Sequence, residues 1–147
     1  MSYAHDMPVA APTLASELRR AVIMASRRIR AERGSADLSD PQYSVLVHLE
    51  RNGQLTPSQL ADLERIQPPS MTRTINCLVE AGLVEKAAHP TDGRVVVVSL
   101  TEQGRTEVAE TRQRRSAWLE AQLAAMEPDE RARLADALEL LWRIAQA

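Results

Sequence analysis

Residues 56–104 read TPSQLADLERIQPPSMTRTINCLVEAGLVEKAAHPTDGRVVVVSLTEQG, and this stretch decides the fold. Two segments with helical apolar spacing come first, and a β-branched run, Val95–Val98, follows beyond a turn rich in polar residues. The order predicts helix, turn, helix and then a two-stranded ribbon. This order is typical of a winged helix-turn-helix, which places one helix in a DNA major groove and a loop beside it.

Two helix starts carry the pattern of a capping box. Ser39 is followed three residues later by Gln42, and Thr56 is followed in the same way by Gln59. In such a box the hydroxyl and the amide each satisfy a backbone N–H group that the first turn leaves without a partner. The helices predicted from these starts span residues 39–52 and about 57–63.

The second helix of the motif opens at Pro68-Pro69-Ser70 and ends at Gly82. Proline is tolerated in a first turn because the N–H groups there have no intrahelical partner. The side chains predicted to face the core are Met71, Ile75, Leu78 and Val79. Arg73 and Asn76 are predicted to point the opposite way, with Thr72 on the shoulder.

The start of this helix carries short or basic side chains and no acid. Hydroxyls and backbone N–H groups at a helix N-terminus suit a phosphate, and an arginine can pair bidentately with guanine. We therefore predict that DNA is contacted by Pro68, Pro69, Ser70, Thr72, Arg73 and Asn76.

A turn over residues 90–93 joins two predicted strands, residues 83–89 and 94–100. Arg94 lies at the tip, where a minor-groove or phosphate contact is natural for a wing. Asp92 stands two residues earlier and can pair with the Arg94 guanidinium. We predict DNA contacts at Asp92 and Arg94; the alternative is that both residues only stabilise a tight turn.

Long helices are predicted around the winged segment, from residue 13 to about 33, from 101 to about 126, and from 128 onward. The first and last carry apolar residues spaced by three and four, and Trp118 and Trp142 add large apolar groups. These stripes predict a symmetric dimer; the alternative is packing within one subunit. The predicted regions are a disordered arm at 1–12, an N-terminal dimerisation helix at 13–37, a DNA-binding lobe at 38–104 and C-terminal dimerisation helices at 105–147.

Five short motifs, in this order, resemble the multiple-antibiotic-resistance regulator (MarR) family: LTPSQLA at 55–61, PSMTR at 69–73, LVEAGLV at 78–84, DGR at 92–94 and LTEQG at 100–104. The resemblance spans about Leu14 to Ala145. It implies a mainly α fold with a small β-wing, and a homodimeric transcription factor, usually a repressor, on a pseudo-palindromic site in double-stranded DNA. It further implies dimerisation through the first and last helices, and a small aromatic or anionic ligand held between that interface and the DNA-binding lobes. The residues that take the recognition-helix and wing roles are Pro69, Ser70, Thr72, Arg73, Asp92 and Arg94.

Composition narrows the function classes. The 147 residues are 44% apolar, which indicates a globular chain, and no run approaches the roughly 18 apolar residues of a membrane span. Aromatic residues make up only 3%, so a base-stacking platform for single strands is not expected. Residues 1–12 lack a signal-peptide pattern, which favours a cytoplasmic protein.

The sequence gives little support for a metal site, a cofactor site or an enzyme active site. Cys77 is the only cysteine and the three histidines are scattered, so no metal or cofactor site is predicted. We expect Cys77 to be an inert small hydrophobe and His48 to be a packed or surface residue, not a ligand. No nucleophile–base pair or carboxylate dyad indicates an enzyme. The net charge of −2 leaves one alternative open, a winged-helix anti-repressor that binds protein and not DNA.

Overall fold

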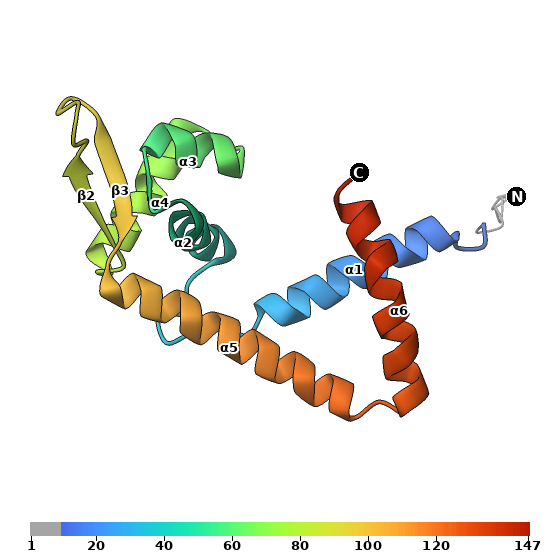
Figure 1. Ribbon diagram of the computed structural model, residues 1–147. Coiled ribbons are helices and arrows are strands. Elements are labelled where there is room, and N and C mark those ends of the chain that lie inside the picture. The colour runs from blue at the N-terminus through green and yellow to red at the C-terminus, as the bar shows by residue number, and fades with distance from the viewer. Residues whose placement is uncertain (1–9) are drawn as a thin grey trace, which may run out of the picture. The chain divides into compact units, whose positions relative to one another are not determined.

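The computed structural model describes residues 10–147 in two compact units, one ending at Ala31 and the other running from Glu32 to Ala147 (Figure 1). The elements in chain order are α1 (Leu14–Arg30), α2 (Asp40–Asn52), β1 (Gln54–Leu55), α3 (Pro57–Glu64), α4 (Pro68–Glu80), β2 (Val84–Ala88), β3 (Val96–Leu100), α5 (Glu102–Ala124) and α6 (Pro128–Ala145). The predicted winged helix-turn-helix is confirmed. The predicted arm at 1–12 lies outside the described residues except for Ala10–Pro12, which are exposed.

The first unit contains α1. A capping box formed by Thr13 and Ser16 starts the helix, and Ala31 caps its end, slightly before the predicted boundary at about 33. None of its residues is buried. Large apolar side chains therefore stand exposed along it: Leu14, Val22, Ile23 and Met24.

The core of the second unit lies between α2, α3, α4 and a small sheet. Val45, Leu46 and Leu49 are buried on α2, so this helix is central, as predicted. The capping boxes predicted at Ser39 and Thr56 are both present. Further core side chains come from the other helices, the strands and the turn before β2: Leu60, Met71, Ile75, Leu78, Leu83, Val84, Val98, Leu100 and Val108.

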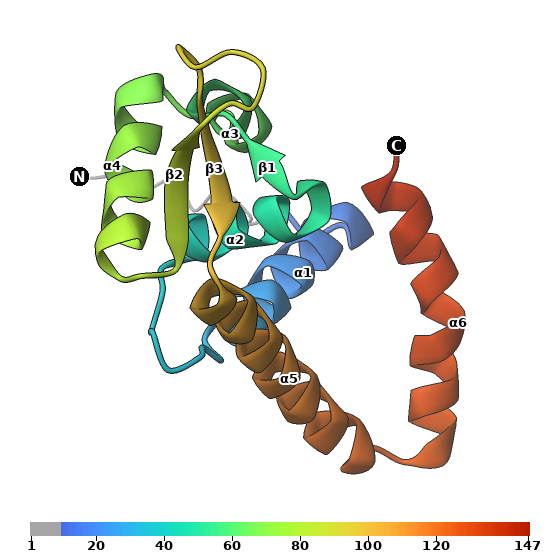
Figure 2. The ribbon, with the colours of Figure 1, turned by 60° about the vertical axis from the view of Figure 1, so that its left-hand side comes forward.

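The sheet has three antiparallel strands in the order β1-β3-β2 (Figure 2). The two-stranded wing, β2 with β3, was predicted, whereas β1 was not. Gln54 and Leu55 pair with Ser99 and Val98 of β3. Two residues are too few to show the alternation by which a strand is recognised in a sequence.

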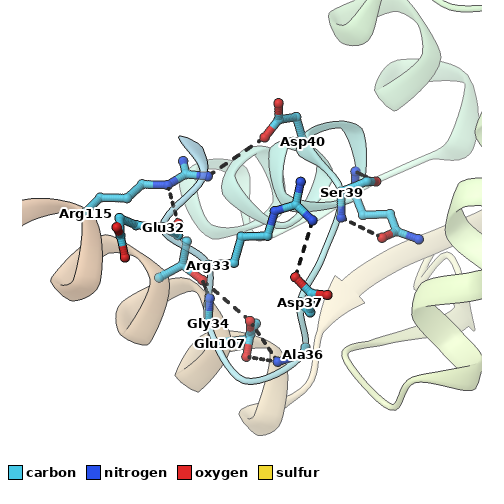
Figure 3. Close-up of polar contacts among 11 residues, drawn as sticks. Glu32, Arg33, Gly34, Ala36, Asp37, Ser39, Asp40, Glu107 and Arg115 are labelled. Carbon is cyan, nitrogen blue, oxygen red and sulfur yellow. Dashed lines mark hydrogen bonds and ion pairs between the residues drawn. The ribbon is translucent and has the colours of Figure 1, made fainter. Parts of the chain in front are cut away.

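A buried carboxylate on α5 holds the loop between α1 and α2 (Figure 3). Glu107 is only 4% exposed, and both of its carboxylate oxygens lie 3.3 Å from the backbone N–H of Ala36. The hydroxyls of Ser35 and Thr111 also donate to Glu107, over 3.4 and 3.5 Å. These bonds compensate the cost of removing a charge from water.

Gly34 lets the same loop approach α5 closely. Its N–H donates to the Thr111 hydroxyl over 3.1 Å. A Cβ atom at Gly34 would lie 2.3 Å from Glu107 Oε1 and 2.7 Å from Thr111 Oγ1, closer than atoms can pack. A side chain at residue 34 would therefore force Glu107 and Thr111 out of the positions in which they bind the loop.

Two arginines of α5 extend the attachment toward α2. The Arg115 Nε donates to the Glu32 carbonyl over 3.2 Å (Figure 3). Its guanidinium lies 4.4 Å from the centre of the Tyr43 ring. Arg112 Nη2 lies 2.6 Å from Glu50 Oε1, and this hydrogen bond raises the pKa of Arg112 above its ordinary value. Through these contacts α5 is fixed to the lobe that carries the wing.

The last helix, α6, begins at Pro128 after a capping box formed by Glu127 and Glu130. None of its residues is buried. Its exposed large apolar side chains are Leu134, Leu138, Leu140, Trp142 and Ile144. Over the part of the chain that the structure describes, no helix is both long enough and apolar enough to serve as a membrane span.

Candidate nucleic-acid interface

Helix α4 has one side that is buried in the core and one side that faces outward. Met71, Ile75 and Leu78 are at most 1% exposed, as predicted. Val79 was predicted to join them but is 38% exposed, so that prediction is wrong. It follows Leu78 by about 100° of helical rotation, which carries it past the edge of the buried stripe.

The outward side of α4 holds most of the residues predicted to contact DNA. The exposed ones are Pro68, Pro69, Thr72, Arg73 and Asn76, and Ser70 is half-buried. Cys77 is also exposed, one turn beyond Arg73. The first turn contains no acidic side chain. An anion at this end of the helix therefore meets no carboxylate of α4.

The first turn offers few backbone donors. Pro68 and Pro69 have no N–H group, and the N–H groups of Ser70 and Met71 donate to the Gln67 carbonyl over 3.0 and 3.1 Å. The backbone part of the predicted phosphate contact therefore has no free donor between residues 68 and 71. A contact here depends on side chains.

Side-chain hydrogen bonds order this turn. Arg73 Nη2 donates to the Ser70 hydroxyl over 3.2 Å, and the Thr72 hydroxyl donates to the Pro68 carbonyl over 3.1 Å. Thr72 keeps its oxygen lone pairs and its methyl group for a ligand. Arg73 keeps most of its five N–H donors, so its planar fork can still pair with two acceptors.

The wing tip is a tight turn closed by backbone bonds. His89 donates its N–H to the Val95 carbonyl over 2.8 Å, and Val95 donates to the Asp92 carbonyl over 3.0 Å. Asp92 Oδ1 accepts from the backbone N–H and the Nε of Arg94, over 3.1 and 3.4 Å. The predicted Asp92–Arg94 pair is thus present. The Arg94 side chain is nevertheless 94% exposed, so its outer nitrogens remain available to DNA.

Lys86 of β2 is a neighbour of α4, although it was not among the residues predicted for this site. Its Nζ donates to Asn76 Oδ1 over 2.7 Å. Strand alternation puts Lys86 on the same face of β2 as the buried Val84, and Figure 2 shows β2 running beside α4. Alternation from Val84 is the signal that could have located it. Among the interactions of the described residues, none joins Arg94 directly to α4.

The end of α3 is joined to α2 by a polar cluster. His48 Nε2 lies 2.8 Å from Glu64 Oε1, and the Ser44 hydroxyl also donates to that oxygen. Arg65 then ends α3 in the left-handed conformation, with φ of 54°. His48 is half-buried and hydrogen-bonded, in agreement with its predicted role as a packed residue.

Comparisons with known proteins agree with this geometry. A model of the MarR family matches residues 38–96. An HTH-type transcriptional regulator of Mycobacterium bovis is 43% identical over 128 residues, covering 87% of this chain and 90% of that protein. A transcriptional regulator structure from Pseudomonas aeruginosa has a TM-score of 0.79 at 34% identity, covering 91% of this chain and 95% of that one. A variant of S. aureus MepR, solved bound to an oligodeoxyribonucleotide, shares the fold with a TM-score of 0.71 at 16% identity, covering 91% and 99% of the two chains.

Proposed function

The chain belongs to the MarR family of transcriptional regulators, and we propose that it acts in the cytoplasm as a homodimeric repressor on a two-fold symmetric operator. The observation that carries the proposal is the outward side of α4, which presents Arg73 beside short polar residues and has no acid in its first turn. This composition suits the edges and phosphates of a major groove. In this proposal α4 is the recognition helix, and Arg94 at the tip of the wing contacts the DNA beside it.

Exposed apolar helices support the dimer. Neither α1 nor α6 has a buried residue, although both carry large apolar side chains. Trp142 is 65% exposed and Leu138 is 51% exposed. Apolar patches of this kind are uncommon on monomers and mark interaction sites. A second copy of the chain can cover them symmetrically, and two copies of α4 would then read two half-sites about 10 bp apart.

Two arginine variants test the DNA contacts. We expect Arg73→Ala to cost roughly 1–3 kcal/mol of binding free energy and to relax specificity at one base pair. Arg94→Ala is expected to weaken binding to all sequences, because a wing arginine contacts phosphate or the minor groove. The salt slope, which is the slope of log binding constant against log salt concentration, should become smaller in magnitude by about 1. The measurement is footprinting on DNA that flanks the gene, followed by titrations at several salt concentrations.

Arg114→Ala is the matched control, because it removes one exposed positive charge from α5, where Arg114 pairs with Glu110 at 2.9 Å. Equal affinity of the wild type, Arg73→Ala and Arg94→Ala at matched salt would contradict the assignment. Absence of any salt-dependent DNA binding would favour the anti-repressor alternative, to which the net charge of −2 points.

We further propose that a small aromatic or anionic ligand relieves repression by favouring a spacing of the two lobes that no longer fits successive major grooves. A ligand can shift this equilibrium only by its difference in affinity for the two spacings. We expect saturating ligand to weaken operator binding about 5–150-fold, and bound operator to weaken ligand binding by the same factor. Calorimetric titration of a ligand with and without operator measures both. Identical ligand affinity in the two titrations would exclude this switch.

A further inference from the structure

The hydrogen bond between Lys86 and Asn76 joins the wing to the outward side of α4. Lys86 Nζ lies 2.7 Å from Asn76 Oδ1, and both side chains are exposed. Lys86 is the only lysine of the chain, whose other basic side chains are arginine and histidine. Asn76 stands one helical turn after Arg73, so the pair and Arg73 lie along the same side of the helix.

Lys86 has no acidic partner among residues 10–147: its one hydrogen bond is to the neutral Asn76 amide. Glu85 is adjacent in sequence, but alternation along the strand places it on the opposite face. The positive charge of Lys86 is therefore not neutralised by a carboxylate. A cation held in this way beside a helix side chain remains available to an electron-rich ligand.

The hydrogen bond also determines which hydrogen-bonding atoms of Asn76 remain free for a ligand. A free asparagine amide presents one acceptor and one donor, which match the N6 and N7 atoms of adenine. Here the acceptor Oδ1 receives the Lys86 ammonium, while the two hydrogens on Nδ2 have no partner among the described residues. The pair thus presents amide and ammonium donors beside a positive charge. A ligand that is complementary to this pair presents only hydrogen-bond acceptors.

We propose that Lys86 is a specificity-determining residue, which makes the Asn76–Lys86 pair a reader of the guanine O6 and N7 acceptors where Asn76 alone would read adenine. The inference rests on the proposed function, because it requires α4 to lie in a major groove. Phosphate oxygens share the same acceptor chemistry. The base is favoured because the ammonium is held against a side chain of α4 and does not point freely from the strand.

The test is selection of binding sequences from a pool of duplexes with a randomised segment. Four proteins are compared: the wild type, Lys86→Met, Asn76→Ala and the control Arg114→Met. Methionine keeps an unbranched side chain and removes the ammonium, which frees Asn76 Oδ1. We expect Lys86→Met to change one position of each half-site from guanine to adenine, with relative affinities shifting about 5- to 150-fold. Asn76→Ala should lose much of the guanine preference there, and Arg114→Met should select the wild-type sequence.

A second readout uses the amine chemistry of a chain with one lysine. Acylation by an amine-directed reagent, followed by peptide mapping of the lysine-containing peptide, reports on Lys86. Bound operator should protect Lys86, and equal reactivity of Lys86 in the free and bound protein would contradict the inference.

The outcomes separate this inference from the proposed function. If the wild type selects a motif that Arg73→Ala relaxes, but Lys86→Met selects the same bases, the inference is wrong and the proposed function stands. Uniform weakening by Lys86→Met, with a salt slope lower by about 1, would assign Lys86 to phosphate and would also overturn it. If the wild type selects no motif, both proposals are wrong.

Discussion

Leu138→Glu is expected to give a monomer that binds a two-half-site operator about 10²–10⁴-fold more weakly than the wild type, because the second recognition helix is no longer tethered to the first. Leu138 is 51% exposed and lies in the middle of α6. A carboxylate placed at the centre of a dimer interface would have to leave water without a partner, which costs several kcal/mol per ion.

The folded lobe should survive this change. Since no residue of α6 is buried, Leu138 contributes no core packing to its own subunit. The variant is therefore expected to bind an isolated half-site with wild-type affinity and to lose only the gain from bivalency. Sedimentation of the free protein, with titrations on full-site and half-site duplexes, measures both effects.

Ala132→Glu provides the matched control. It introduces the same charge into the same helix, at an exposed position that shares a side with Asp136, Glu139 and Arg143. This variant should remain dimeric and bind the full site normally. A Leu138→Glu protein that still sediments as a dimer would show that α6 is not the dimer contact. Loss of binding to the half-site would show that the lobe itself had been damaged.

The sequence predicted those features that depend on short stretches of chain. The capping boxes at Ser39 and Thr56 place hydroxyl and amide groups three residues apart. The sequence spacing therefore predicts the hydrogen bonds directly, because both partners belong to the same helical turn. The Asp92–Arg94 pair at the wing tip is equally local. The buried stripe of α4 follows from helical spacing, with the exception of Val79 at its edge.

Contacts between distant segments could not be predicted in this way. The Lys86–Asn76 bond depends on how β2 packs beside α4, and the bonds from Ala36 to Glu107 join residues 71 positions apart. A glutamate on a helix is ordinarily exposed, and nothing in its neighbours marks Glu107 as buried. Such pairs are set by the tertiary packing of the lobe, which local periodicity does not encode.

Gly104 marks the place where the wing is joined to α5. The Thr101 hydroxyl donates to the Gly82 carbonyl and accepts from the Gly104 N–H at 3.1 Å. The Thr101 N–H donates to the Leu83 carbonyl over 3.1 Å. These bonds draw the first turn of α5 onto the chain that links α4 to β2. A Cβ atom at Gly104 would lie 2.0 Å from the Leu83 oxygen.

We expect Gly104→Ala to lower the free energy of unfolding by about 1–3 kcal/mol. Alanine in an open helical position gains up to about 1 kcal/mol over glycine. Overpacking of a close contact costs typically about 1–3 kcal/mol, and occasionally more. The overpacking cost should prevail here, because the clashing atom is a backbone carbonyl that cannot turn aside like a side chain. Moving it would also break the bond that it accepts from Thr101.

Denaturant unfolding of the Gly104→Ala variant beside Gly93→Ala makes this comparison quantitative. Gly93 lies in the wing turn, where no heavy atom comes within 4 Å of an added Cβ. Its replacement should change the unfolding free energy by no more than about 0.5 kcal/mol. If the two variants unfold at the same denaturant concentration, α5 can move away from Leu83 at little cost. The junction between the wing and α5 would then be flexible, and a change in lobe spacing could arise from a change in the angle between the lobe and α5. If Gly104→Ala alone is destabilised, the contact between the first turn of α5 and Leu83 is rigid, and the proposed change in lobe spacing would move the lobe and α5 together.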